Sequence, residues 1–222
     1  MIMNIIDFHA HILPCADHGS DSKDTSQMQL ALAREAGVDI IVATPHFYPH
    51  RHNVSEFINR RANALNELGS DTIPRIVSAA EVLLCEGIER LPDLEKLTVE
   101  GTKSLLIELP FSDFRDSYFK SIEALLDKGY DIIIAHADRY PEKNIETLLE
   151  LKVKLQLNAD AFSGFFIKKH IKDWIEKGAV YALGSDIHKA DKKAYKNFLK
   201  ARAKLKSSFE VINTKANKIL SK

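Results

Sequence analysis

The sequence predicts an α/β fold in which seven parallel strands, each followed by helical structure, close into a distorted TIM-like barrel. Short apolar runs alternate with amphipathic segments almost to the end of the 222 residues, which is the pattern of parallel strands joined by helical crossovers. Each of the seven runs also precedes a polar side chain able to bind a metal ion. Strand ends meet at one mouth in a closed barrel but spread along an edge in an open sheet. The polar side chains therefore favour the barrel.

The seven apolar runs are the predicted strands. They are residues 4–6, 39–43, 73–80, 104–109, 131–135, 154–157 and 180–183. Each is short, apolar and bounded by polar or turn-forming residues, as buried strands are. The first run leads into His9 and His11. Because residues i and i+2 of an extended chain point to the same side, these two imidazoles can hold one ion.

The segments between the runs predict helices. The first begins with Asp24 or Thr25 as its N-cap and stops at Gly37, and the second has Ser55 as its N-cap and stops at Gly69. Further helices are expected from about 114 to 129, from about 144 to 151 and from about 167 to 177. The segment 189–222 is expected to be helical, with its many lysines on a solvated face.

The bulk composition favours a single domain, residues 1–222, with no glycine- or serine-rich linker. Basic and acidic residues balance at 31 each, so the net charge predicts no nucleic-acid partner. No apolar run approaches the roughly 20 residues that span a bilayer, and no leader pattern is visible, so membrane insertion is not expected. Cys15 and Cys85 form no metal-type pair and no disulfide framework, which favours a reducing cytoplasm.

The polar side chains near the strand ends are the candidate metal ligands. They are His9, His11, His18, His46, Glu81, Glu108, His136, Asp186 and His188, and Asn158 ends the sixth run. One first-row ion takes about four to six ligands, so this set predicts two or three divalent ions. Mixed imidazole and carboxylate ligands suit manganese, iron or zinc. His18 lies in a polar loop and is equally well explained as an exposed side chain.

Clustered ions at an open barrel mouth predict hydrolysis, since they lower the pKa of a bound water from about 15.7 toward about 7. Arg139 follows His136 by three residues, and its planar fork of donors suits phosphoryl oxygens. This moves the expected substrate from amides to phosphate esters. The alternative for Arg139 is a surface ion pair with Asp138 or Glu142, which would contribute little to the stability of the fold.

Six motifs, in order along nearly the whole chain, resemble the PHP (polymerase and histidinol phosphatase) superfamily. They are Asp7-Phe-His9-Ala-His11, Thr44-Pro-His46, Ala80-Glu81, Ile107-Glu108, His136-Ala-Asp-Arg139 and Ser185-Asp-Ile-His188. Within it they are most similar to the bacterial manganese-dependent protein-tyrosine phosphatases of capsule and exopolysaccharide loci.

The resemblance implies a distorted seven-stranded barrel with three ions, manganese being expected. It assigns His9, His11, Glu81 and Asp186 to the first ion, Glu81, Glu108 and His136 to the second, and His18, His46 and His188 to the third. It also assigns phosphate binding to Arg139, with Glu108 and His46 beside it among the catalytic groups.

Two positions depart from the pattern of these phosphatases. Where they usually carry Asp-Asp-Gly, this chain has Asp17-His18-Gly19, so that the third-ion ligand would be a histidine. A second phosphate-binding arginine is expected shortly after His188, where this chain offers Lys192 and Lys193. We expect Lys193 to contact phosphate, although lysine lacks the bidentate fork of arginine.

The expected function is hydrolysis of phosphotyrosine by a metal-dependent protein-tyrosine phosphatase, with a bacterial tyrosine kinase of polysaccharide synthesis as substrate. The alternative is a phosphatase for histidinol phosphate or another small phosphoester. An amidohydrolase-type barrel would place a bridging lysine after the fourth strand, where this chain has Glu108. A nucleic-acid-binding module would need a basic surface with aromatic side chains between the charges. Self-association into a homo-oligomer stays open.

Overall fold

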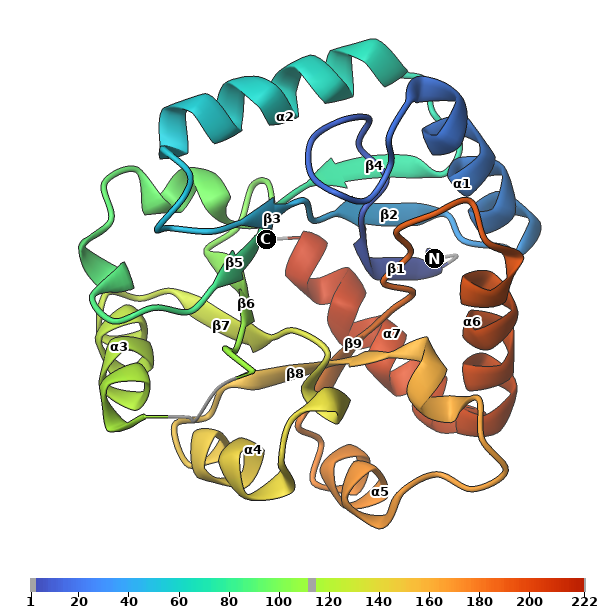
Figure 1. The fold of residues 1–222 in the computed structure, drawn as a ribbon. Helices are drawn as coiled ribbons and strands as arrows, with labels where there is room; N and C mark the ends of the chain where they lie inside the picture. The colour runs from blue at the N-terminus through green and yellow to red at the C-terminus, as the bar shows by residue number, and fades with distance from the viewer. Residues whose placement is uncertain (1–2, 112–114, 222) are drawn as a thin grey trace.

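Parallel strands with helices around them form the fold (Figure 1). The computed structural model describes residues 3–111 and 115–221. The strands in this part of the chain are β1 (Ile6–Ala10), β2 (Ile40–Ala43), β3 (His46–Phe47), β4 (Arg75–Ser78), β5 (Glu81–Leu83), β6 (Ser104–Glu108), β7 (Asp131–Ile134), β8 (Lys154–Asn158) and β9 (Val180–Gly184). The α-helices are α1 (Lys23–Glu35), α2 (Val54–Leu68), α3 (Asp116–Asp127), α4 (Glu142–Leu149), α5 (Lys169–Glu176), α6 (Lys192–Leu205) and α7 (Ser207–Leu220). The predicted α/β class with parallel strands is confirmed.

The strands pair in two parallel sheets, in the orders β1-β2-β4 and β3-β5-β6-β7-β8-β9. The sheets meet where the end of β1 pairs with the segment that follows β9. There Ala10 bridges Ile187 in parallel, and the N–H of His11 donates to the carbonyl of Ile187 at 2.9 Å. In return the N–H of Asp186 donates to the carbonyl of His9 at 2.8 Å. The ends of β1 and β9 are therefore held side by side.

Two of the predicted strands are each followed by a short strand that was not predicted. The run 39–43 gives β2, and β3 follows beyond Thr44 and Pro45; the run 73–80 gives β4, and β5 follows at Glu81. Proline has no N–H to donate to a strand ladder, so pairing is interrupted there. The N–H of Glu81 instead donates to the carbonyl of Pro45 at 3.1 Å. The break changes partners and sets Glu81 beside His46, its register partner in β3.

The strands are buried on both faces, as expected for a parallel sheet covered by helices. Alternate residues belong to two apolar clusters: Phe8 and Val42 lie in the smaller one, and Ile41 and Ala43 in the larger one. Figure 1 shows α1 to α6 around the outside of the strands, while α7 crosses the middle of the view beside β9. The inner face of α7 adds Ala216 to the smaller cluster.

The predicted helix starts were wrong by two or three residues. Ser22 is the N-cap of α1, and its hydroxyl accepts a hydrogen bond from the N–H of Thr25 at 3.2 Å. Asn53 is the N-cap of α2, and its side chain accepts from the N–H of Ser55 at 2.8 Å. The cap is the last residue before helical geometry, and it accepts from residues two or three positions later. The start predicted near residue 114 lies outside the described residues.

The first strand also differs from its prediction, because β1 begins at Ile6 and continues through His9 to Ala10. His9 thus lies inside a fully buried strand. None of the described helices is long and apolar enough to cross a membrane.

Buried Asp7 ties three parts of the fold together. One carboxylate oxygen accepts the N–H of Ser185, just beyond β9, at 2.8 Å, and the other accepts the Tyr195 hydroxyl of α6 at 2.8 Å. Burial raises the pKa of Asp7 above its usual range, while the hydrogen bonds from Ser185 and Tyr195 oppose the shift. The carboxylate therefore depends on these donors, since a buried charge without partners is costly.

We predict that Tyr195→Phe lowers the free energy of unfolding by about 1–3 kcal/mol, because it leaves an oxygen of Asp7 buried without a donor. Urea unfolding followed by circular dichroism measures the effect. Tyr181→Phe is the matched control, since the Tyr181 hydroxyl forms no hydrogen bond with the described residues. Equal unfolding midpoints for wild type and Tyr195→Phe would show that the bond does not stabilise the fold.

Candidate metal centre

Most of the predicted ligands converge at the carboxyl ends of the strands. In the described part of the chain, three overlapping groups bring ligand atoms from three residues to within 4.8 Å of one another. The groups are His9 with His11 and Asp186, His46 with Glu81 and Glu108, and His11 with His46 and His188. His136 lies beside the second group, with its Nε2 2.7 Å from Glu81 Oε1.

The spacing of the first group fits an ion at its centre. The Nε2 atoms of His9 and His11 are 3.1 Å apart, and they lie 3.6 and 3.3 Å from Asp186 Oδ1. Glu81 Oε2 is 3.2 Å from the first nitrogen and 3.3 Å from the second. Ligands at about 2.1 Å from one ion are about 3.0–3.4 Å apart in tetrahedral or octahedral geometry. Four of the five distances fall in this range and the fifth, 3.6 Å between His9 and Asp186, lies just above it, so the four side chains expected to hold the first ion meet at distances that suit one ion.

Hydrogen bonds fix which nitrogen of each imidazole faces the group. The Nδ1 of His9 lies 3.0 Å from Gln156 Oε1, a carbonyl oxygen that only accepts, so Nδ1 carries the proton. The Nδ1 of His11 lies 2.6 Å from a carboxylate oxygen of Asp17 and is protonated for the same reason. The Nε2 atoms of the two rings, 3.1 Å apart, are therefore the nitrogens that face the group and can bind an ion.

Glu81 belongs to the second group and also approaches imidazoles of the other two. Its Oε2 lies 2.9 Å from His46 Nδ1, and it approaches His9 and His11 with the same oxygen. Burial would raise the pKa of Glu81, but the surrounding imidazoles, His9 foremost, hold it well below its usual range. The carboxylate is therefore ionised, and its two oxygens reach different imidazoles, as a carboxylate that bridges two ions must do.

Unpartnered buried atoms support the same conclusion. Glu81 Oε2 and His46 Nδ1 are buried and face each other, yet neither forms a hydrogen bond with the residues that the structure describes. Buried polar atoms without partners are rare in folded proteins and call for an ion or a water molecule. The chemistry of these donors, nitrogen and oxygen without thiolate, suits manganese, iron or zinc.

The third group contains His11 where the resemblance implies His18. The His18 side chain is exposed, and its ring centroid lies 4.6 Å from that of His46 and 4.9 Å from that of His188. His18 is therefore next to the group but outside it, and its role as a ligand stays a prediction. Burial lowers the pKa of His188 to about 4, so this ring is neutral at pH 7, the form that binds metal.

Glu108 lies on the outer side of the cluster, with its two oxygens 3.7 Å from His46 Nδ1 and 3.8 Å from His136 Nε2. Burial, and next the negative charge of Glu81, raise the pKa of Glu108 to about 7. Glu108 and His46 are each 7% exposed, whereas His9 and His11 are fully buried. A substrate can therefore approach from the side of Glu108 and His46.

Three polar side chains that position the cluster were not identified as such from the sequence. Asp17 accepts from the N–H of His46 at 2.9 Å and contacts His11. In β8, Gln156 accepts from the N–H of His136 at 2.6 Å, and Asn158 donates to Asp186 Oδ2 at 2.9 Å. Gln156 interrupts an otherwise apolar run, and that interruption was the available signal.

Two glycines pack so closely against the cluster that neither position has room for a side chain. A Cβ on Gly184 would lie 2.5 Å from His9 Cβ, and one on Gly19 would lie 2.4 Å from His11 Cβ. His136 and Asp186 adopt left-handed conformations, with φ of 32° and 52°. Such conformations are costly for residues other than glycine and gather at functional sites. Here they turn two candidate ligands toward the mouth.

Arg139 lies at the edge of the cluster, in the 3₁₀ turn Ala137–Arg139 that follows β7. Its Nη2 is 2.8 Å from Asp186 Oδ2, and its side chain is 39% exposed. The ion pair is thus with a candidate ligand, and the alternative of a surface pair with Asp138 or Glu142 was wrong. Exposed guanidinium donors remain available beside the carboxylates.

Lys193 lies in the first turn of α6, where its side chain is exposed. Its N–H donates to the Asp191 side chain at 2.8 Å, which caps the helix. The amine forms no ion pair or hydrogen bond with the residues that the structure describes. The expected contact between Lys193 and phosphate stays a prediction.

The fold and the grouped side chains define a class: α/β proteins with clustered metal ligands at the carboxyl ends of parallel strands, a class that includes metal-dependent hydrolases. Within it, the chain belongs to the capsular polysaccharide synthesis family CpsB/CapC, whose model matches residues 5–221. The predicted resemblance is confirmed at the level of this family.

Characterised relatives share most of their length with the chain. The tyrosine-protein phosphatase YwqE of Bacillus subtilis (strain 168) is 30% identical over 203 residues, which are 83% of this chain and 77% of YwqE. The tyrosine-protein phosphatase CpsB of Streptococcus pneumoniae is 26% identical over 206 residues, 84% of each chain.

The fold has a counterpart among the crystal structures of YwqE and CpsB, which are described as unique metal-dependent tyrosine phosphatases. The superposition has a TM-score of 0.76 at 23% identity and covers 97% of this chain and 94% of the other. At this identity, the likeness shows the same fold.

We predict that Glu81→Ala lowers the bound metal by more than one equivalent, because Glu81 lies against imidazoles of every group. His136→Ala, which removes a contact of only one Glu81 oxygen, should cost about one equivalent. Elemental analysis of purified protein after dialysis measures both losses.

The control is Glu35→Ala, which removes an exposed carboxylate at the end of α1 and should leave the metal content unchanged. Circular dichroism shows whether each variant is folded. Full metal occupancy in folded Glu81→Ala would remove this carboxylate from the site.

Proposed function

We propose that this chain is a metal-dependent protein-tyrosine phosphatase that hydrolyses the phosphate ester of phosphotyrosine. The observation that carries the proposal is the position of Arg139, whose guanidinium lies against Asp186 at the edge of the imidazole–carboxylate cluster. Two relatives with 30% and 26% identity are tyrosine-protein phosphatases, which supports the same reaction and substrate.

The proposed metal site holds two or three divalent ions, with manganese expected and iron or zinc as alternatives. One ion is assigned to His9, His11, Glu81 and Asp186, a second to Glu81, Glu108 and His136, and a third to His18, His46 and His188. The grouping of His11 with His46 and His188 supports His11 as a neighbour of the third ion as well. When bound, such ions activate water as a nucleophile and neutralise phosphoryl charge.

The residues of the chain have separate tasks in this proposal. Arg139 binds two non-bridging oxygens of the phosphoryl group with its planar fork and holds phosphorus in line for attack. Glu108 and His46 line the side from which the substrate approaches and form the wall of the site that faces it. Gln156 holds the protonated Nδ1 of His9, and Asp17 holds that of His11, so both rings keep the tautomer that faces the cluster.

We also infer that the two sheets close into one distorted barrel of seven strand units within a single domain, residues 1–222. The support is the pairing of the β1 end with residues 186 and 187, which joins the first unit to the last. Counting the interrupted pairs β2 with β3 and β4 with β5 as one unit each gives seven units.

The proposed substrate is a phosphotyrosine-containing protein, namely a bacterial tyrosine kinase of capsule or exopolysaccharide synthesis, and the proposed location is the cytoplasm. Membership of a capsular polysaccharide synthesis family supports the pathway. The two free cysteines, Cys15 and Cys85, accord with a reducing compartment.

We predict that Arg139→Ala lowers kcat on a phosphotyrosine peptide by a factor on the order of 10²–10³, because one preorganised donor to the transition state is lost. Arg139→Lys should recover only part of the rate, since lysine restores the charge without the fork. Steady-state kinetics together with metal analysis separate this effect from loss of ions.

Arg34→Ala, which removes an exposed arginine from the last turn of α1, is the matched control and should keep the wild-type rate. If Arg139→Ala stays within a few-fold of wild type in kcat and KM, phosphate is held elsewhere.

We predict that chelation abolishes hydrolysis of phosphotyrosine peptides and that readdition of manganese restores it, while Cys15→Ser and Cys85→Ser remain active. The proposed nucleophile is water, so neither thiol takes part. A panel that includes histidinol phosphate measures substrate preference. Loss of activity in either cysteine variant with fold and metal content intact would contradict the mechanism, and a clear preference for histidinol phosphate would contradict the proposed substrate.

A further inference from the structure

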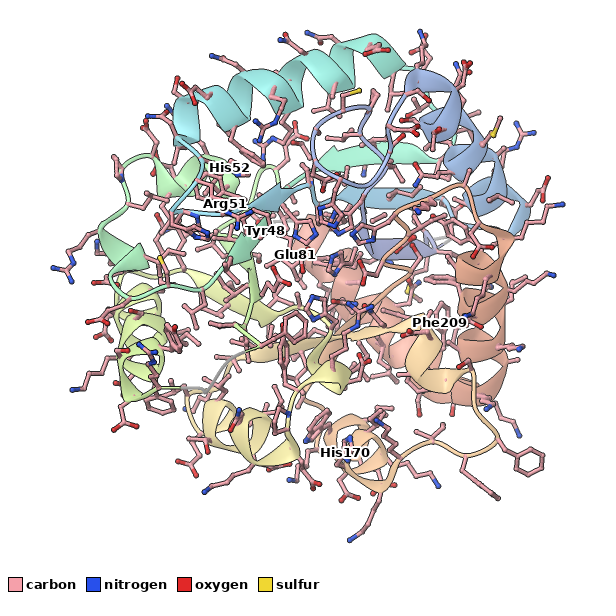
Figure 2. All side chains as sticks on the ribbon, in the orientation of Figure 1. Tyr48, Arg51, His52, Glu81, His170 and Phe209 are labelled. Atoms are coloured by element: carbon pink, nitrogen blue, oxygen red, sulfur yellow. The ribbon has the colours of Figure 1, made fainter. Side chains whose placement is uncertain are left out.

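A hollow with a volume of about 290 Å³ opens next to the cluster of candidate metal ligands. Its wall includes His46 and His18 on the side of the cluster, and Tyr48, Arg51 and Arg60 on the other side. Figure 2 shows Tyr48, Arg51 and His52 gathered close to Glu81, on the segment between β3 and α2. The hollow is therefore reached from the same mouth as the cluster.

The arginines of this hollow carry charge that the fold does not neutralise. Arg51 is exposed, and its Cζ lies 5.7 Å from the centre of the Tyr48 ring. Arg60 donates through Nε to the carbonyl of Ala16 at 2.8 Å, and its two terminal nitrogens have no acceptor in the described part of the chain. Among the described residues, neither guanidinium has a carboxylate within ion-pair distance. Both are held in place by contacts that leave the charge available.

Asp17, the acidic residue that lines the hollow, pairs with His11 and not with the arginines. Asp17 lies 2.6 Å from His11 Nδ1 through one oxygen, which also accepts from the N–H of His46. Its other oxygen accepts from the N–H of Gly19 at 2.8 Å. The contacts with His11 hold the pKa of Asp17 well below its usual range, in spite of burial. This carboxylate therefore compensates the imidazole and not the arginines.

The surroundings of His52, which also lines the hollow, show that the local electrostatic field is positive. Burial lowers the pKa of His52, and the neighbouring positive charges of Arg60 and Arg51 lower it further. Its Nδ1 accepts the N–H of Tyr48 at 3.1 Å, so the ring is neutral and holds the loop in place. A ligand entering the hollow meets a positive field on a braced segment.

Tyr48 connects the hollow to the reaction site. Its ring stacks on His46, with centroids 5.2 Å apart and planes 17° apart, and His46 belongs to two of the ligand groups. An anion bound by Arg51 is consequently separated from the cluster by little more than one aromatic ring. That separation suits a neighbouring residue of the same peptide and excludes the reacting phosphate itself.

We propose that this hollow is a second substrate subsite, which binds an anionic side chain next to the phosphotyrosine in the substrate, either a carboxylate or a second phosphate. The guanidinium fork suits both anions, and its position over the Tyr48 ring preorganises it. The subsite rests on the proposed phosphatase function and adds a preference for acidic or multiply phosphorylated sequences.

The test measures kcat/KM of the manganese-loaded enzyme on four peptides that differ only beside one phosphotyrosine: glutamate, glutamine, lysine or a second phosphotyrosine. Wild type should prefer the glutamate or the doubly phosphorylated peptide over the glutamine peptide by roughly five- to tenfold. Arg51→Gln should bring that ratio close to one, mainly through KM, and Arg51→Glu should shift the preference to the lysine peptide. Arg34→Gln, far along α1, should keep the wild-type ratio.

The two anionic peptides distinguish the source of the charge, because the one whose ratio falls most in Arg51→Gln carries the preferred group. Hydrolysis of all peptides without any preference, or an acidic preference that survives in Arg51→Glu, overturns the subsite and leaves the phosphatase function standing. Failure of wild type to hydrolyse every peptide overturns the phosphatase function and the subsite with it.

Discussion

The rest of the structure depends on the burial of one carboxylate, that of Glu81. This side chain is 1% exposed, and a buried charge without compensation would cost several kcal/mol. Four imidazoles surround it, those of His9, His11, His46 and His136, at 2.7–3.3 Å. They come from β1 and the residue after it, from β3 and from the turn after β7, so the strand ends must converge for the carboxylate to be buried at all. Fold and site therefore depend on the same contact.

Around this contact, hydrogen bonds and close packing fix the imidazoles before any ion binds. Asp17 and Gln156 set the protonated nitrogens of two rings, and Gly184 lets β9 approach His9. A site held in this way loses little entropy when a ligand binds, which is the general advantage of preorganisation. On its open side, the cluster is bordered by Arg139 and by the hollow at Arg51. In the proposed function, Arg139 on one side of the mouth binds the reacting phosphate, and in the proposed subsite Arg51 binds an anionic neighbour of the phosphotyrosine.

The sequence predicted what depends on periodicity and on strand ends, and it missed what depends on register. The alternation of strands and helices, and the position of Glu81 and Glu108 after apolar runs, follow from burial alone and were predicted. The short strands β3 and β5 were missed, because they form by pairing with each other across the chain, which no single segment specifies. Gln156 was missed for the same reason, because only the pairing of β8 with its neighbours turns this side chain toward His9.

The most direct test of the central claim, that Glu81 is surrounded by imidazoles because they share metal ions, is anomalous diffraction from crystals grown with manganese. The account predicts an anomalous peak about 2 Å from Glu81 Oε2, between His9, His11 and Asp186, with a further peak on the side of Glu108. Crystals in which manganese binds only elsewhere, while the imidazoles remain joined to Glu81 by hydrogen bonds alone, would contradict it.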